Sequence, residues 1–145
     1  MRNASNYESD FHAWAGEQAA LLRERRFAEA DIDNIAEEID ALGRSEKRAL
    51  VSRLAVLLTH LLKWQFQPGH RSASWELTIS EQRRALARLL RDNPSLRAAL
   101  DEAIVDAYGD ALLASRRETG FAAQTFPPAC PYTPGQIAAD DFYPE

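Results

Sequence analysis

The stretch from residue 44 to residue 66 reads RSEKRALVSRLAVLLTHLLKWQF and decides the fold of the chain. On a helical wheel of about 100° per residue, its apolar side chains cover about half of the circumference. These side chains are Leu50, Val51, Leu54, Ala55, Leu57, Leu58, Leu61 and Leu62. A helix that packs on one neighbour needs a narrower apolar stripe, so this wide arc predicts a helix that is buried against two neighbours.

Helical spacing also dominates the rest of the chain up to residue 120, and no alternating strand pattern competes with it. Asp10 is a suitable N-cap for a first helix over residues 11–25. Further helices are predicted from residue 31 or 33 to residue 43, over residues 44–66, 75–91 and 94–119. Breaks are predicted at Gly43, Pro68-Gly69, Asn93-Pro94 and Gly120. Apolar residues before Gly43 recur at helical spacing and are expected to face inward: Ile32, Ile35, Ile39 and Leu42.

The last 25 residues differ in composition from the helical part, because they hold five of the seven prolines and no Lys or Arg. They also hold five aromatic residues: Phe121, Phe126, Tyr132, Phe142 and Tyr143. Disordered tails are poor in aromatic residues, so we expect this segment to dock on the helices. The predicted fold is all-α, a bundle of four main helices over residues 1–120 with the tail, residues 121–145, packed on the same single domain.

Charge is distributed unevenly along the chain. Residues 44–91 carry a net charge of +7, whereas residues 1–43 and residues 92–145 each carry −6, which gives −5 in total. A basic middle between acidic flanks either meets an external anion or is neutralised by the flanks. The overall negative charge argues against a protein that coats nucleic acid along its whole surface.

Composition narrows the class of protein further. One cysteine, Cys130, excludes an internal disulfide and multi-cysteine zinc motifs, which fits a reducing compartment. The longest uncharged run in the apolar middle spans the nine residues 54–62, whereas a membrane span needs about 20. The N-terminal residues lead into no apolar run that would suggest a signal peptide. We expect a soluble cytoplasmic protein that has no membrane partner.

Several blocks of the sequence resemble one known family. They are DFHAWAGEQAALLRERRF (10–27), NIAEEIDALGRSEKRAL (34–50), LLTHLLKWQFQPGHRSASWELTISEQR (57–83), DNPSLR (92–97) and FPPACPYT (126–133). In this order they are similar to the bacterial domain-of-unknown-function family 29, DUF29, over nearly the whole chain. The resemblance implies a small, mostly helical bacterial protein. It carries no known reaction, so it assigns no catalytic residue.

A corner between two predicted helices gathers aromatic and basic residues that are candidates for binding: Lys63, Trp64, His70, Arg71 and Trp75. The two tryptophans offer stacking surfaces and the two cations offer charge, which together suit a pocket for an anionic or aromatic ligand. The alternative explanation, which we favour, is that the tryptophans pack at the end of the bundle and that the cations are solvated.

Arg53 and His60 match the Arg-x(4–6)-His spacing of metal-independent helical ribonucleases of the HEPN type. Such an arginine stabilises a pentavalent phosphate while the histidine moves a proton. Seven residues apart, the two side chains fall on one helical face, but about one such match is expected by chance in a chain with this much arginine. The alternative explanation is a half-buried His60 that bonds to a neighbouring group.

No other chemistry is supported by the sequence. No histidine has a glutamate three residues before it, so the paired Glu-x-x-His motif of di-metal bundles is missing. Nucleotide-binding glycine motifs and the Gly-x-Ser-x-Gly motif are also missing. Cys130 has no base beside it in the sequence to activate it as a nucleophile. We therefore expect no metal and no cofactor.

The function predicted from the sequence is that of a small helical binding module, whose ligand is a protein or a polyanion met by the basic second and third helices. Arg84 and Arg88 are the binding candidates on this face. Two alternatives stay open: a nuclease that uses Arg53 and His60, and a structural homo-oligomer subunit that buries its apolar arc against a second copy. We expect weak RNA binding, because most of six cations should lie within reach of acidic groups from other helices: Lys47, Arg48, Arg83, Arg84, Arg88 and Arg91.

Overall fold

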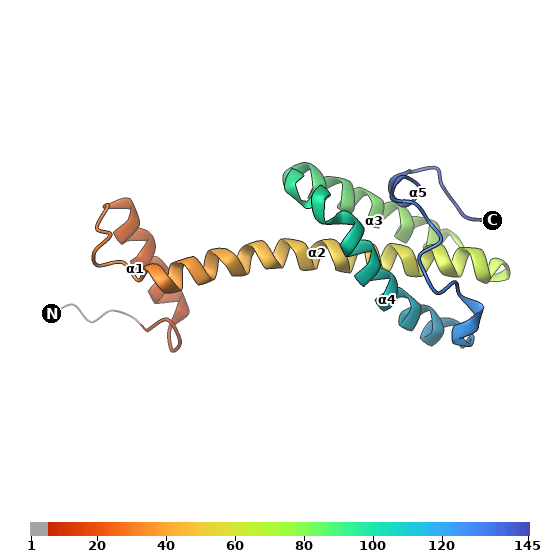
Figure 1. Cartoon of the computed structure of the whole chain (residues 1–145), viewed down its shortest axis with the longest axis horizontal. Coiled ribbons are helices and arrows are strands. Elements are labelled where there is room, and N and C mark those ends of the chain that lie inside the picture. Colours follow the sequence, from red (N-terminus) through yellow and green to blue (C-terminus); the bar gives the residue numbers. More distant parts are fainter. Residues whose placement is uncertain (1–5) are drawn as a thin grey trace. The chain divides into compact units, whose positions relative to one another are not determined.

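The computed structural model describes residues 6–145, and every regular element in this part of the chain is a helix (Figure 1). The main helices are α1 (Phe11–Arg23), α2 (Ile32–Phe66), α3 (Ala73–Asp92) and α4 (Leu100–Thr119). The short helices are η1 (Pro68–His70), η2 (Pro94–Ala99), η3 (Ala123–Thr125) and α5 (Pro134–Ala138). The predicted all-α fold with four main helices is confirmed.

Two compact units make up the chain, and the boundary between them falls inside α2, between Ser45 and Glu46. The first unit contains α1 and the beginning of α2. The second unit contains the rest of α2, the other helices and the C-terminal tail. The prediction that the whole chain forms a single domain stays a prediction.

Helix α2 runs without a break through Gly43, so the predicted stop or kink at this residue is wrong. A glycine costs a helix about 1 kcal/mol relative to alanine, and here good helix formers, Leu42 and Arg44, lie on both sides of it. No proline follows, and one glycine does not outweigh the cooperative extension of a helix of 35 residues. The breaks at Pro68-Gly69, Asn93-Pro94 and Gly120 are confirmed.

In the first unit, α1 is tied to the start of α2 by two polar contacts. The Trp14 indole N–H donates to the Asp31 carboxylate at 3.0 Å, and the Gln18 side-chain oxygen accepts from the Asp31 backbone N–H at 2.7 Å. Trp14 and Gln18 are both buried. The expectation that Ile32, Ile39 and Leu42 face inward is wrong, because they are 51%, 63% and 69% exposed. The two contacts with α1 reach Asp31, just before α2 begins, and leave these apolar side chains uncovered.

The second unit is built around the leucine-rich half of α2. Six of its leucines are completely buried: Leu50, Leu54, Leu57, Leu58, Leu61 and Leu62. Helix α3 covers them with Ile79, Leu86 and Leu90, and α4 brings the buried alanines Ala103, Ala107 and Ala111. Small side chains allow two helix backbones to approach closely, so α4 packs tightly on this core. The predicted burial of the apolar arc against two neighbours is confirmed.

The C-terminal tail completes the cover of this core (Figure 1). Phe126, Tyr132 and Ile137 are buried in it, and α5 lies against both α3 and α4. Tyr132 donates its hydroxyl to the side-chain oxygen of Gln65 at 2.7 Å, and Tyr108 donates to the carbonyl of Pro127 at 2.6 Å. The docked tail that the aromatic content predicted is therefore confirmed.

We expect Gly43→Ala to raise the free energy of unfolding by about 0.5–1 kcal/mol, because alanine favours a helix interior and loses less chain entropy on folding. A Cβ atom at this position meets no other atom within 4 Å. Urea denaturation followed by circular dichroism measures the change. The matched control is Gly120→Ala at φ 75°, which should destabilise the protein. A loss of stability in Gly43→Ala would show that α2 is bent at this residue in solution.

Candidate functional site

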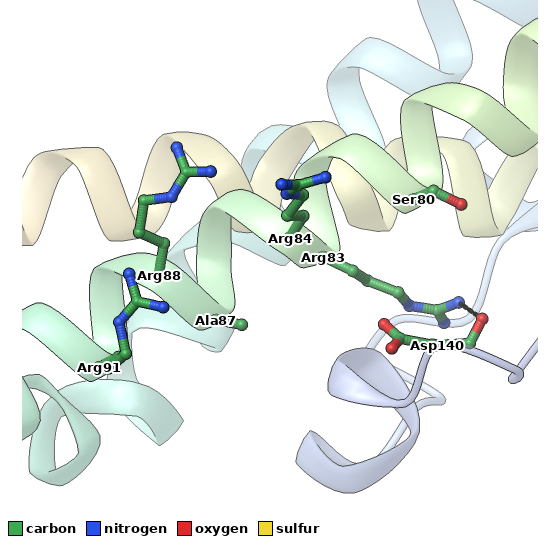
Figure 2. A pocket seen from close by; sticks show the side chains of 7 residues that line it. All are labelled: Ser80, Arg83, Arg84, Ala87, Arg88, Arg91 and Asp140. Atoms are coloured by element: carbon green, nitrogen blue, oxygen red, sulfur yellow. Dashed lines mark hydrogen bonds between the residues drawn. The ribbon is translucent and has the colours of Figure 1, made fainter.

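Four arginines line an open groove along α3 (Figure 2). The groove has a volume of about 630 Å³ and is lined by Ser80, Arg83, Arg84, Ala87, Arg88, Arg91 and Asp140. Six of these residues come from one side of α3, where two rows, 80-84-88-91 and 83-87-91, run at intervals of three or four positions, and Asp140 comes from the tail after α5. We call this site the arginine groove.

Arg83 forms the floor of the arginine groove and also holds the tail in place. Its side chain is only 2% exposed and donates three hydrogen bonds to backbone carbonyls: to Ile137 at 2.9 Å, Gln136 at 3.2 Å and Asp140 at 3.4 Å. The first two carbonyls belong to the last turn of α5, where a helix has unpaired acceptors and a partial negative charge. Arg83 therefore caps α5 from outside.

The charge of Arg83 is compensated without a direct ion pair. Its guanidinium lies 5.6 Å from the centre of the Tyr143 ring, a distance typical of a cation–π contact. Burial lowers the pKa of Arg83, while the nearby Tyr143, Asp140 and Asp141 oppose this change. An arginine stays protonated in proteins despite such a shift, so the floor of the groove keeps a fixed positive charge.

Arg84, Arg88 and Arg91 form the exposed wall of the arginine groove, as Figure 2 shows. Within residues 6–145, no carboxylate lies within 4.0 Å of the guanidinium of Arg84 or Arg88. Arg91 approaches only its chain neighbour Asp92, at 3.4 Å, and both side chains are largely exposed. An exposed pair of this kind contributes at most about 1 kcal/mol, so the Arg91 guanidinium can leave Asp92 at little cost in free energy.

The structure corrects the prediction that acidic groups of other helices neutralise most of the six cations. Among the described residues, Lys47 alone of the six makes such a pair, with Glu102 of α4 at 3.6 Å. Arg48 has no carboxylate within salt-bridge distance in the described chain. The physical reason is geometric: the basic face of α3 points to solvent, whereas α2 and α4 pack on the opposite, apolar face of that helix.

The aromatic corner is the cluster of Lys63, Trp64, His70, Arg71 and Trp75 between α2 and α3. Its cations and tryptophans contact one another. Lys63 lies over the ring of Trp75 at 4.7 Å and pairs with Glu118 at 3.7 Å. Arg71 lies over the ring of Trp64 at 5.0 Å. The tail ring of Tyr143 also packs on Trp64, with 4.8 Å between the ring centres. The tryptophan faces are thus occupied by the protein's own cations and by its tail.

His70 completes the corner and is exposed in η1. Arg71 is held there by hydrogen bonds from its guanidinium to the backbone carbonyls of Trp64, at 2.8 Å, and Pro144, at 3.5 Å. These bonds fix the end of the tail to the end of α2. Of the alternative that we favoured for this corner, the packing of the tryptophans agrees with these contacts. Its solvated cations do not, because Lys63 is buried and Arg71 donates to two carbonyls.

His60 lines a cavity that Arg53 does not reach. His60 lines a cavity of about 410 Å³ whose wall is formed by Ala55, Val56, Thr59, His60, Asp110, Ala114, Arg117 and Glu118. Arg53 is exposed on α2 and is not part of this wall. The Nδ1–H of His60 donates to the Val56 carbonyl at 2.8 Å, which leaves Nε2 as the acceptor in the neutral ring. Burial lowers the pKa of His60.

Two other sites suggested by residue type have no reactive geometry. The Cys130 thiol donates to the Tyr132 carbonyl at 3.5 Å, and burial raises its pKa, which disfavours the nucleophilic thiolate. Over residues 6–145, no group of three or more His, Cys, Asp or Glu side chains is arranged to hold a metal ion.

The residues of the arginine groove that the sequence did not single out are Ser80, Ala87 and Asp140. Ser80 carries a weak signal, because it precedes Arg84 and Arg88 at the same spacing of four residues along one helical face. Asp140 carries none, because its position depends on backbone carbonyls of the tail, which have no signature in the sequence.

Comparison with known families supports the resemblance found in the sequence. The model of the family described as "Domain of unknown function DUF29" matches residues 6–143. The chain belongs to the DUF29 family. No curated protein and no solved structure gives a significant match to it. In the described part of this DUF29 protein, no helix combines the length and the apolar character needed to cross a membrane.

We expect Arg83→Met in this DUF29 protein to lower the free energy of unfolding by about 2–4 kcal/mol, because three backbone carbonyls lose a charged donor. The tail should also become open to chymotrypsin, which cuts beside the aromatic residues that now pack on the core. Mass spectrometry of the fragments over time measures this. Arg84→Met is the matched control and should leave both stability and cleavage nearly unchanged. Equal protection of the tail in both variants would contradict the proposed role of Arg83.

We expect His60→Gln to flatten the dependence of stability on pH between about pH 6.5 and pH 5. The folded-state pKa of His60 is lowered, so the unfolded chain binds a proton first as the pH falls. The stabilisation due to His60 is therefore complete above its unfolded pKa and is lost as the pH falls through its folded pKa. Urea denaturation at several pH values measures this, with His70→Gln as the exposed control. An unchanged slope in His60→Gln would contradict the burial of a neutral imidazole.

Proposed function

We propose that this DUF29 protein is a binding module that holds an anionic ligand in the arginine groove of α3. The observation that carries the proposal is the pair Arg84 and Arg88, which lie one turn apart on an exposed face and have no carboxylate within salt-bridge distance in the described chain. Guanidinium groups bind phosphate and carboxylate through paired hydrogen bonds, so two free ones side by side form a ready anion site.

The negative net charge of the chain does not oppose a ligand that stays inside the groove. At physiological salt the field of a surface charge is screened over about 8 Å, so the four nearest arginines dominate the potential there. The groove volume of about 630 Å³ also falls within the range of small-ligand pockets, about 300–1,000 Å³. Charge and size therefore both support a bound anion.

The two alternative functions have less support. A nuclease that uses Arg53 and His60 needs both side chains at one cleft, whereas only His60 lines the cavity beside α2 and α4. A homo-oligomer subunit was suggested by the apolar arc of residues 50–62, and this arc is covered by α3, α4 and the tail of the same chain. The arginine groove keeps its charge available.

The experiment compares the retention of the purified protein on heparin-agarose with that of two double variants. In Arg84→Gln/Arg88→Gln, we expect the affinity for heparin at low salt to fall at least tenfold, because each arginine contributes charge-assisted hydrogen bonds. Arg97→Gln/Arg116→Gln changes the net charge equally but outside the groove, and should change affinity less than twofold. Equal losses in both variants, or no retention of the wild-type protein, would contradict the proposed site.

A further inference from the structure

The arginine groove is short, and carboxylates lie at its limits. Arg84 and Arg91 begin about 10 Å apart along the helix axis, at 1.5 Å per residue. At one end of the groove, the Asp92 carboxylate lies 3.4 Å from the Arg91 guanidinium. Asp140 lines the side of the groove opposite α3. A long polyanion that leaves the groove meets these negative charges, which weaken its binding relative to that of a short one. The geometry favours a ligand whose whole charge fits between them.

The groove lacks a surface on which a nucleobase can stack. Its lining holds Ser80 and Ala87 among the arginines and no aromatic side chain. The aromatic rings near the groove are already in use, because Tyr143 lies under Arg83 and packs on Trp64. Recognition of single-stranded nucleic acid relies on base stacking, so this site is built to bind the charged part of a ligand and not a base.

The floor of the groove is preorganised for an anion. Three of the five N–H groups of Arg83 are bound to backbone carbonyls, and the side chain is only 2% exposed, so what it brings to the groove is a fixed positive charge. These bonds and the contact with Tyr143 hold the guanidinium in place, so no side-chain entropy is lost there when a ligand binds. Arg84, Arg88 and Arg91 line the same groove from the exposed side of α3 (Figure 2).

Linked phosphates suit this arrangement better than carboxylates do. A carboxylate is planar and has two oxygens, which one or two guanidinium groups satisfy. A phosphate group is tetrahedral and brings three strong acceptor oxygens and a charge of about −1.5 to −2. Its oxygens can accept hydrogen bonds from more than one arginine of the wall at the same time. Two or three linked phosphates would occupy the short row of arginines without reaching Asp92.

On the basis of the proposed function, we propose that the arginine groove binds a short run of linked phosphates, such as a pyrophosphate or triphosphate group. The phosphates alone carry the recognition, with Arg83 as a fixed positive charge below them and Arg84, Arg88 and Arg91 as the hydrogen-bonding side chains. The same chemistry is offered by free inorganic polyphosphate and by the phosphate chain of a nucleoside triphosphate. Their relative affinities distinguish these two sources.

The test is isothermal titration calorimetry of the full chain at physiological salt without divalent cations, with sodium tripolyphosphate, ATP, citrate and heparin as probes. We expect tripolyphosphate to bind one site. ATP should bind within about threefold of it if the base contributes nothing, whereas citrate should bind at least tenfold more weakly. Arg84→Gln/Arg88→Gln should weaken tripolyphosphate at least tenfold, and Arg97→Gln/Arg116→Gln less than twofold. ATP bound much more tightly than tripolyphosphate would assign the site to a nucleotide.

A second variant is expected to bind more tightly, a result that misfolding cannot produce. Asp140→Asn removes a negative charge from the wall of the groove, while the backbone carbonyl of residue 140 can still accept from Arg83. We expect it to bind tripolyphosphate several-fold more tightly than the wild-type chain. Unchanged or weaker binding in Asp140→Asn would contradict the placement of the ligand.

The outcomes separate this inference from the proposed function. Binding of heparin that depends on Arg84 and Arg88, without binding of tripolyphosphate, would overturn the assignment to short phosphates and leave the anion-binding module intact. Citrate bound as tightly as tripolyphosphate would overturn the preference for phosphate alone. No groove-dependent binding of any probe would overturn both.

Discussion

The structure of residues 46–145 depends on the burial of one leucine arc that is too wide for a single neighbour. Each fully buried leucine stabilises the fold by about 1.5–3 kcal/mol relative to an exposed one, and six of them lie in one stretch of α2. Helices α3 and α4 cover most of the arc, and the tail with Phe126, Tyr132 and Ile137 covers what they leave. The tail is therefore a part of the core, although its regular structure in the described chain is limited to the short helices η3 and α5.

This arrangement explains why the basic charge faces outward. α3 uses its apolar side, with Ile79, Leu86 and Leu90, to cover the leucines, so its other side must face solvent. The acidic residues on the exposed side of α4, such as Asp101 and Asp106, belong to a helix that packs elsewhere on the core. In the described chain, the acidic residues of α4 therefore pair with Lys47 and Lys63 of α2 and not with the arginines of α3. The positive potential along α3 follows directly from the packing of the core.

The sequence was informative where a local pattern coincides with packing. The leucine periodicity of residues 50–62 identified the central helix. The glycine and proline signals after Phe66 and Asp92 correctly placed the two breaks that follow α2 and α3. It failed at Gly43, because helix cooperativity outweighs one unfavourable residue. It also failed at Ile39 and Leu42, because apolar spacing predicts a stripe but not whether another element covers that stripe.

The candidate site was predictable to a similar extent. Arg84 and Arg88 were identifiable from charge and spacing on one helix, but their lack of acidic partners was not, because it depends on which way α3 is rotated on the core. Nothing in the sequence indicated that Arg83 has a different role from Arg84. A step of 100° around the helix separates it from Arg84, and this step changes a solvated cation into a buried cap for α5.

The way in which Arg83 holds the tail has a consequence for how the sequence can change. Its three acceptors are main-chain carbonyls, which every amino acid possesses. Substitutions at positions 136, 137 and 140 leave this contact chemically intact, as long as the backbone keeps its course. The reverse does not hold, because only a planar guanidinium supplies several divergent donors from one side chain. This contact therefore depends on the identity of one residue of α3 and not on the identity of the side chains at its three acceptor positions.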